Sequence, residues 1–193
     1  GTVAVQLTLE ALAQSIFDQT GVQYSVFDNP FISDGESGGQ PGGNIRVAFL
    51  YRDDRVDLDE ATAFTITDET GAIDAAFANS RAPLGAEFTF NGEKVTVIGN
   101  HFTSKIGSDS SFSATLPPTN AGALARAAQA AAVNAVVDDL LTADPEARIV
   151  VAGDFNEFQF EEPLEVLPGE LDFDGGSVTA GGEHVLTNQT YEL

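Results

Sequence analysis

The 193-residue chain carries 8 basic and 30 acidic residues, for a formal net charge of −22, and contains neither cysteine nor methionine. This balance argues against a broad nucleic-acid footprint of surface cations, and the lack of cysteine excludes disulfides and thiol chemistry. Residues 1–193 are predicted to form one domain, and no apolar run approaches the roughly 20 residues that cross a bilayer.

The N-terminal half is predicted to contain one helix and several strands. Apolar residues recur at helical spacing over residues 8–20, and Gly21 follows as a stop signal. Residues 22–27 read as a strand, residues 34–43 as a loop rich in Gly, Ser and Pro, and residues 45–51 as a buried strand. Further strands are predicted over residues 61–66, 86–90 and 94–100, and Asn91-Gly92 predicts a hairpin between the last two.

The C-terminal half is predicted to contain a long helix and a short buried strand. Residues 121–141 form an alanine-rich helix capped by Asn120, with an apolar stripe expected to lie on a sheet: Leu124, Ala128, Ala131, Val136 and Leu140. A loop of Ser, Thr and Pro at residues 108–118 precedes it and is long enough to be functional. Residues 171–183 show no clear period. Strands mixed with helices predict an α/β or α+β domain.

The sharpest local signal is the run Ile149-Val150-Val151-Ala152-Gly153-Asp154-Phe155-Asn156. It reads as a strand buried on both faces that ends at a glycine, where ligand chemistry gathers in such sheets. If the extended geometry persists, Asp154 and Asn156 point the same way and offer oxygen atoms to a divalent metal or a water. The alternative is a strand-to-turn junction with Asp and Asn placed there for turn chemistry.

Four ordered motifs carry a resemblance to a known family. They are the Gly42-Gly43-Asn44-Ile45-Arg46-Val47 segment through Tyr51-Arg52, the Arg81-x-Pro83-Leu84 segment, Asn100-His101-Phe102-x-Ser104-Lys105, and Gly153-Asp154-Phe155-Asn156. Together they resemble the endonuclease/exonuclease/phosphatase superfamily, in particular its secreted, deoxyribonuclease-like bacterial branch. The resemblance implies a four-layer sandwich of two packed mixed β-sheets flanked by helices, with the site at the strand ends. It also implies an extracellular or periplasmic protein.

The resemblance assigns roles to residues of these motifs. Asp154 would activate or orient the attacking water, Asn156 would hold the phosphate or the nucleophile, and His101 would donate a proton or hydrogen bond. Asp154 and Asn156 would also ligate a divalent metal, magnesium first, with manganese or calcium as alternatives. Arg81 would clamp phosphate, because a guanidinium matches two oxygens. The remaining substrate-binding candidates are Asn100, Ser104, Lys105 and Asn44.

The chain has few cations and two histidines, and their positions carry further predictions. Four of the 8 cations fall in the matched motifs and predict a positive pocket for a specific anion: Arg46, Arg52, Arg81 and Lys105. Arg81 could equally belong to a surface ion pair. His184 has no matching motif around it and reads as a loop residue.

The sequence also departs from the family pattern at both ends. Val3-Ala4-Val5-Gln6 resembles the approach to a metal-binding glutamate, but Leu7 stands in its place, unless these residues lead into the first helix. No Ser-Asp-His motif follows near Leu193. We therefore expect a domain incomplete at both ends, inactive or nearly so alone, that belongs to a larger polypeptide and has open sheet edges for pairing with another chain.

Three functions remain open on this sequence. The first is a metal-dependent phosphodiester hydrolase, most simply an extracellular nuclease acting on DNA or RNA. The second is a phosphomonoesterase or a phospholipid or inositol-phosphate hydrolase of the same fold, since the substrate loops are not diagnostic. The third is a non-catalytic acidic module of a large secreted protein, favoured by the absent glutamate and opposed by the intact His101, Asp154 and Asn156.

Overall fold

A computed structural model describes residues 5–32, 45–110 and 112–180, and these residues separate into two compact units. The described parts of the first unit lie within residues 1–101 and 147–154, and those of the second within residues 102–146 and 155–193. Each unit is described by itself below. None of the helices in the described ranges is both long and apolar enough to span a membrane.

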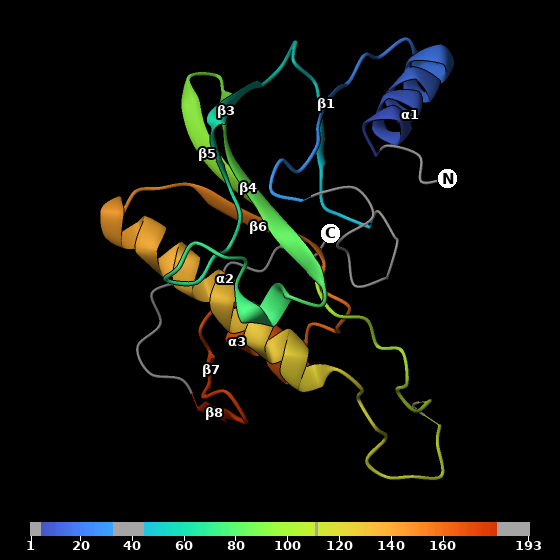
Figure 1. The fold of residues 1–193 in the computed structure, drawn as a ribbon, viewed down its shortest axis with the longest axis vertical. Coiled ribbons are helices and arrows are strands. Elements are labelled where there is room, and N and C mark those ends of the chain that lie inside the picture. Colours follow the sequence, from blue (N-terminus) through green and yellow to red (C-terminus); the bar gives the residue numbers. More distant parts are fainter. Residues whose placement is uncertain (1–4, 33–44, 111, 181–193) are drawn as a thin grey trace. The chain divides into compact units, whose positions relative to one another are not determined.

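The first unit is built on a four-stranded mixed sheet with the order β3-β4-β5-β6 (Figure 1). Its strands are β3 (Asp57–Phe64), β4 (Arg81–Phe90), β5 (Glu93–His101) and β6 (Ile149–Asp154). The first two pairings are antiparallel, and β5 pairs with β6 in parallel. Because β5 and β6 are parallel, the residues that follow both strands leave the sheet at the same edge.

The β4–β5 connection confirms the predicted hairpin. Asn91 and Gly92 both have positive φ values, 53° and 84°, which a two-residue turn of the I′ type requires. The hairpin sets the register, so that inward-facing residues of the two strands meet in the core. Leu84, Ala86 and Ile98 are fully buried there, and Phe49 and Tyr51 pack edge-on against Phe88.

The remaining elements of the first unit are short or peripheral. They are α1 (Val5–Thr20), the antiparallel pair β1 (Ser25–Phe27) and β2 (Phe49–Tyr51), and the 3-10 helix η1 (Ala75–Phe77). The helix begins at Val5, so Gln6 and Leu7 lie within its first turn. The predicted buried strand over residues 45–51 shortens to three half-buried residues.

Strand β6 differs from its prediction in burial. The sequence run suggested a strand covered on both faces, but Val150 is 46% exposed, residues 152–154 are exposed, and Ile149 and Val151 are only half-buried. The reason is position: β6 lies at the edge of the sheet, and no other described strand pairs with it. Pairing of this edge with another chain stays a prediction.

The second unit contains α2 (Ala123–Ala143), α3 (Glu162–Val166) and a hairpin of β7 (Leu171–Phe173) and β8 (Val178–Ala180). The predicted apolar stripe of α2 was out of phase, since Leu124 is 56% exposed. The buried face instead holds Arg126, Ala127, Gln129, Ala130, Val133 and Val137. The predicted cap was also wrong, because the helix begins after Gly122, which has a left-handed backbone and makes no side-chain capping bond.

Strands and helices of both units confirm the predicted α/β class. The stacking of two sheets into four layers, and the single domain over residues 1–193, stay predictions.

Candidate active site

Three of the predicted site residues meet at one edge of the first unit's sheet. Arg81 begins β4, His101 ends β5 and Asp154 ends β6. In the register of the sheet, His101 is opposite Arg81 on one side and opposite Asp154 on the other. A register shift between Arg81 and Leu84 interrupts the β4–β5 ladder next to this point, and irregularities of this kind re-aim side chains at strand ends.

His101 and Asp154 form one titratable pair of this edge. His101 Nε2 lies 3.7 Å from Asp154 Oδ2, which is longer than a direct hydrogen bond, and the two side chains are 32% and 65% exposed. Burial and the positive charge of Arg81 lower the pKa of His101, and the Asp154 carboxylate offsets this only in part. The imidazole is therefore neutral at neutral pH, able to accept a proton at one nitrogen and to donate one at the other.

Arg81 brings a largely buried positive charge to the same edge. The residue is 8% exposed, and burial lowers the pKa of its guanidinium while Asp154 raises it. An arginine stays protonated at any ordinary pH, so the edge carries one fixed cation beside one neutral imidazole and one exposed carboxylate. The guanidinium of Arg81 is the group of this edge that would attract an anion.

Gly153 allows the end of β6 to lie close to the backbone of Asn100 in β5, next to His101 and Asp154. Its φ is +142°, and a Cβ atom there would lie 1.9 Å from the backbone oxygen of Asn100. Only glycine fits this backbone. Asn100 itself is 3% exposed and donates through Nδ2 to Ile98 O at 2.9 Å, so it lies under the surface of the sheet rather than on it.

A buried amide oxygen is the second feature of Asn100. Its Oδ1 atom has no hydrogen-bond partner among the described residues. A water or the hydroxyl of a ligand would satisfy it, since buried acceptors are rarely left unpaired.

These residues do not fit a complete protein-held metal centre. No cluster of three or more His, Cys, Asp or Glu side chains that could hold a metal occurs in the described part of the chain. Magnesium is commonly held by one or two carboxylates and keeps several waters. Asp154 supplies one exposed carboxylate, which is too little to define a site.

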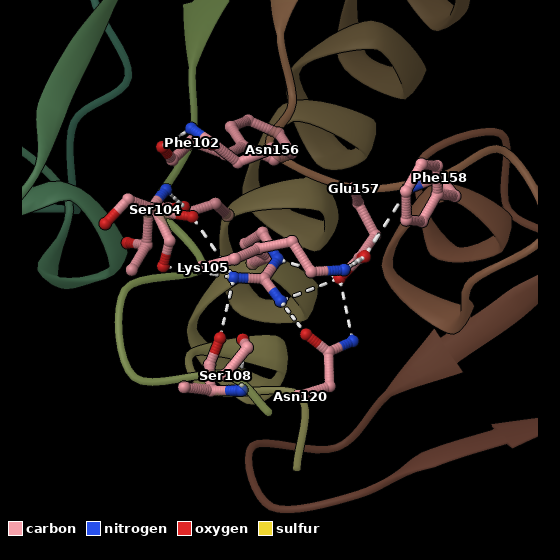
Figure 2. Close-up of polar contacts among 12 residues, drawn as sticks. Phe102, Ser104, Lys105, Ser108, Asn120, Asn156, Glu157 and Phe158 are labelled. Atoms are coloured by element: carbon pink, nitrogen blue, oxygen red, sulfur yellow. Dashed lines mark hydrogen bonds and ion pairs between the residues drawn. The ribbon is translucent and has the colours of Figure 1, made fainter. Parts of the chain in front are cut away.

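The other predicted site residues lie in the second unit, except for Asn44, which lies outside the described residues. Asn156 has a left-handed backbone with φ of 51°, so the extended geometry that would align it with Asp154 ends at β6. Its Nδ2 donates to Phe102 O at 3.0 Å (Figure 2). Ser104 offers its backbone oxygen to Arg126 at 3.3 Å.

Lys105 belongs to a buried ionic network that the sequence did not reveal. Lys105 Nζ contacts one carboxylate oxygen of Glu157, and Asn120 Nδ2 and Arg126 donate to the other, from 3.0 Å and 2.7 Å (Figure 2). The Arg126 and Glu157 side chains are both 0% exposed. Burial raises the pKa of Glu157, but the hydrogen bonds from Lys105, Asn120 and Arg126 outweigh it and leave the pKa below its usual value.

Arg126 joins three segments of the second unit. Besides Glu157, its guanidinium donates to Asn120 Oδ1 at 2.5 Å and to the backbone oxygens of Thr103, Ser104 and Ala121. The network therefore fixes the loop before α2 to the segment that follows β6. The available sequence signal was Arg126 itself, the single charged residue within residues 121–137 of an alanine-rich helix.

The predicted positive pocket is weaker than four free cations would make it. Arg46 pairs with Asp28 at 3.3 Å, Arg52 pairs with Asp54 at 2.5 Å, and Lys105 pairs with Glu157. Arg81, the fourth predicted cation, lies opposite His101 in the sheet register.

Comparison with known proteins gave one family and several solved structures. Residues 31–169 match the profile described as the endonuclease/exonuclease/phosphatase family, which is well over half of the chain. No curated protein matches.

The solved structures are distant. TDP2 from D. rerio, complexed with a single strand DNA product, is 20% identical, with 82% of this chain and 50% of that chain covered at a TM-score of 0.44. A functionally unknown conserved protein from Enterococcus faecalis V583 is 17% identical, with 84% and 64% covered at a TM-score of 0.48. An endonuclease/exonuclease/phosphatase family protein from Bacteroides thetaiotaomicron is 18% identical, with 83% and 52% covered at a TM-score of 0.46. The chain spans about half the length of the TDP2 structures that it matches.

Proposed function

The chain belongs to the endonuclease/exonuclease/phosphatase family, and from this premise we propose that it hydrolyses phosphodiester bonds, with nucleic acid as the substrate. Members of the family are phosphoester hydrolases, and they generally use divalent metals. The observation that supports the proposal is the meeting of His101, Asp154 and Arg81 at one sheet edge, with 3.7 Å between the imidazole and the carboxylate.

The chemistry of a phosphodiester matches these three groups. Water attacks the phosphorus atom in line while negative charge on the phosphate oxygens is neutralised; the opposite P–O ester bond breaks, and the departing oxygen takes up a proton. The neutral imidazole of His101 accepts a proton from the water or donates a hydrogen bond to a phosphate oxygen. The Asp154 carboxylate orients the water or the imidazole, and the fixed charge of Arg81 attracts the phosphate.

A divalent metal is part of the proposal but no step is assigned to it. Asp154 would be one carboxylate ligand, and the described residues hold no cluster of three or more His, Cys, Asp or Glu side chains that could complete the site. For the same reason we propose that the chain by itself has little activity. An extracellular or periplasmic location rests on the resemblance to the secreted branch.

A second candidate is a non-catalytic acidic module that keeps the fold. It is favoured by the lack of a metal-binding cluster in the described residues and by the net charge of −22. Such a module would retain the core of the sheet without depending on the chemistry of His101.

The test is a phosphodiesterase assay on single- and double-stranded DNA and on RNA, with magnesium, manganese or calcium and with a chelator. It is run on this chain and on a form extended at both ends by its neighbouring coding sequence. We expect metal-dependent cleavage by the extended form, lowered about 100-fold or more in His101→Ala and Asp154→Ala. Lys94→Gln, which changes a 70% exposed cation on the hairpin, is the control and keeps full activity.

Two results would contradict the proposal. Absence of cleavage by the extended form with every metal would favour the non-catalytic module. Cleavage that survives in both His101→Ala and Asp154→Ala would place the chemistry elsewhere. Full activity of the 193-residue chain would contradict only the prediction that this chain alone has little activity.

A further inference from the structure

Two exposed aromatic rings in the second unit lie parallel to one another. The rings of Phe158 and Phe160 have centroids 5.4 Å apart and an angle of 6° between their planes, and the residues are 55% and 67% exposed. Exposure of aromatic side chains to water is unfavourable, and neighbouring exposed rings form an apolar patch. Such patches often mark a site where a ligand or another molecule binds. The pair is therefore a candidate binding surface.

The patch is attached to the most firmly held part of the unit. Phe158 follows Glu157, whose side chain is fully buried among Lys105, Asn120 and Arg126. After Phe158 the backbone closes a turn, with Glu161 N donating to Phe158 O at 3.0 Å, and Pro163 is buried soon after. Both ends of the short segment are thus anchored, so the rings are presented in advance of any ligand.

The exposed charge that lies over the Phe158 ring is positive. Lys105 Nζ lies 5.1 Å from the centroid of the Phe158 ring and the side chain is 30% exposed, whereas Arg126 and Glu157 are completely buried. Two cations and one carboxylate leave one net positive charge in the network. On a chain of net charge −22, the sign is reversed within this network, and its exposed ammonium group is the part that would attract an anion.

The rings of Phe158 and Phe160, together with the ammonium group of Lys105, suit a ligand that has both a flat aromatic part and a negative charge. Unpaired nucleobases stack on aromatic side chains irrespective of sequence, and their phosphates pair with neighbouring cations. Glu161 and Glu162 follow Phe160, so a long run of phosphates would meet repulsion there. The surface thus suits a base with its own phosphate better than the backbone of a duplex.

We propose that Phe158, Phe160 and Lys105 form a stacking platform for an unpaired nucleobase, which makes single-stranded nucleic acid the substrate class of this chain. The inference deepens the proposed function and rests on it. It also separates nucleic acid from the phospholipids, inositol phosphates and small phosphomonoesters that the same family fold could accept.

Binding is measured without hydrolysis, on the 193-residue chain in the presence of chelator. The probes are a fluorescein-labelled thymidine trinucleotide and an abasic trinucleotide with the same phosphates, and binding is followed by fluorescence anisotropy. We expect the thymidine probe to bind more tightly than the abasic one. Phe158→Ala and Phe160→Ala should each weaken thymidine binding roughly fivefold or more, and should leave the abasic probe unchanged.

Two further variants make the assay specific. Phe158→Leu keeps an apolar side chain but removes the π face, so it should behave like Phe158→Ala. Phe17→Ala alters a 45% exposed phenylalanine on α1 in the first unit and should bind like the parent chain. Far-UV circular dichroism checks that each variant folds, which the exposure of both rings leads us to expect.

The outcomes separate this inference from the proposed function. Equal binding of the two probes, or full binding by Phe158→Leu, would overturn the platform while leaving hydrolysis to be judged by the extended form. Base-dependent binding without any cleavage by that form would uphold the platform and remove the hydrolase. If the two alanine variants instead lose sedimentation with phosphatidylglycerol vesicles and keep oligonucleotide binding, the surface faces lipid and the inference fails.

Discussion

Replacing Glu157 with glutamine should destabilise the second unit far more than its small change in shape suggests. One carboxylate oxygen of Glu157 accepts from Lys105, and the other accepts from Asn120 and from two nitrogens of Arg126. A glutamine amide must turn its NH₂ group toward one of these sides. At least one donor then faces another donor, and the buried guanidinium loses its counter-charge.

The magnitude follows from burial. Both the Arg126 and the Glu157 side chains are 0% exposed, so water cannot compensate for the lost partner. Breaking a buried pair by removing one member costs about 3–5 kcal/mol. For a chain of this size, that corresponds to a drop in melting temperature of roughly 6 to 20 °C.

The assay is thermal and urea denaturation of the parent chain, Glu157→Gln and a matched control. Glu93→Gln makes the same chemical change in an ion pair with Arg148 whose side chains are 62% and 58% exposed, and it should cost at most about 1 kcal/mol. The reasoning is refuted if Glu157→Gln costs no more than Glu93→Gln.

The difference in stability between the parent chain and Glu157→Gln should depend on pH in a defined direction. The pKa of Glu157 is lower in the folded chain than its usual value, because the hydrogen bonds from its partners outweigh the effect of burial. Its contribution is therefore complete above the pKa of the unfolded chain and is lost as the pH falls through the folded pKa. The parent chain and Glu157→Gln should approach one another in stability as the solution is acidified.

Two further predictions concern the first unit. Arg81→Gln should raise the pKa of His101 and Asp154→Asn should lower it, because Arg81 opposes the charged imidazole and Asp154 supports it. An NMR titration of the chain's two histidines measures both shifts, and a shared direction would contradict the assignment. Gly153→Ala should cost more stability than Gly71→Ala, since both have positive φ but only Gly153 has a backbone oxygen 1.9 Å from the added Cβ. Equal melting temperatures of the two variants would show that the backbone around Gly153 can move away from the added Cβ without loss of stability.

The sheet edge was accessible to sequence reasoning because it depends on local signals. Asn91-Gly92 fixes the hairpin, and runs of branched apolar residues mark β5 and β6. Once the polar residues at the ends of these two strands are noted, parallel pairing brings His101 and Asp154 together. Their roles in catalysis stay predictions.

The buried ionic network around Arg126 and Glu157 could not be predicted from the sequence, because its members are far apart along the chain. Arg126 and Glu157 are 31 positions apart, and a charged residue in a helix is ordinarily assigned to the solvent side. Alanine carries little hydrophobic signal, so the phase of α2 could not be set from its own pattern. Asn120 seemed a helix cap because Asn is common there, but its side chain contacts Arg126 and Glu157 instead.

The outer edge of β6, where no described strand pairs, is predicted to pair with another chain, and on that prediction ionic strength acts on this chain in two opposing ways. With no described strand on its outer edge and Val150 46% exposed, β6 offers backbone groups to any second copy that comes near. Chains of charge −22 repel one another, and that repulsion reaches about 10 Å at 0.1 M salt but only about 3 Å at 1 M. Added salt thus weakens the electrostatic repulsion within one chain, which stabilises its fold. It also weakens the repulsion between two chains, which favours pairing of their β6 edges.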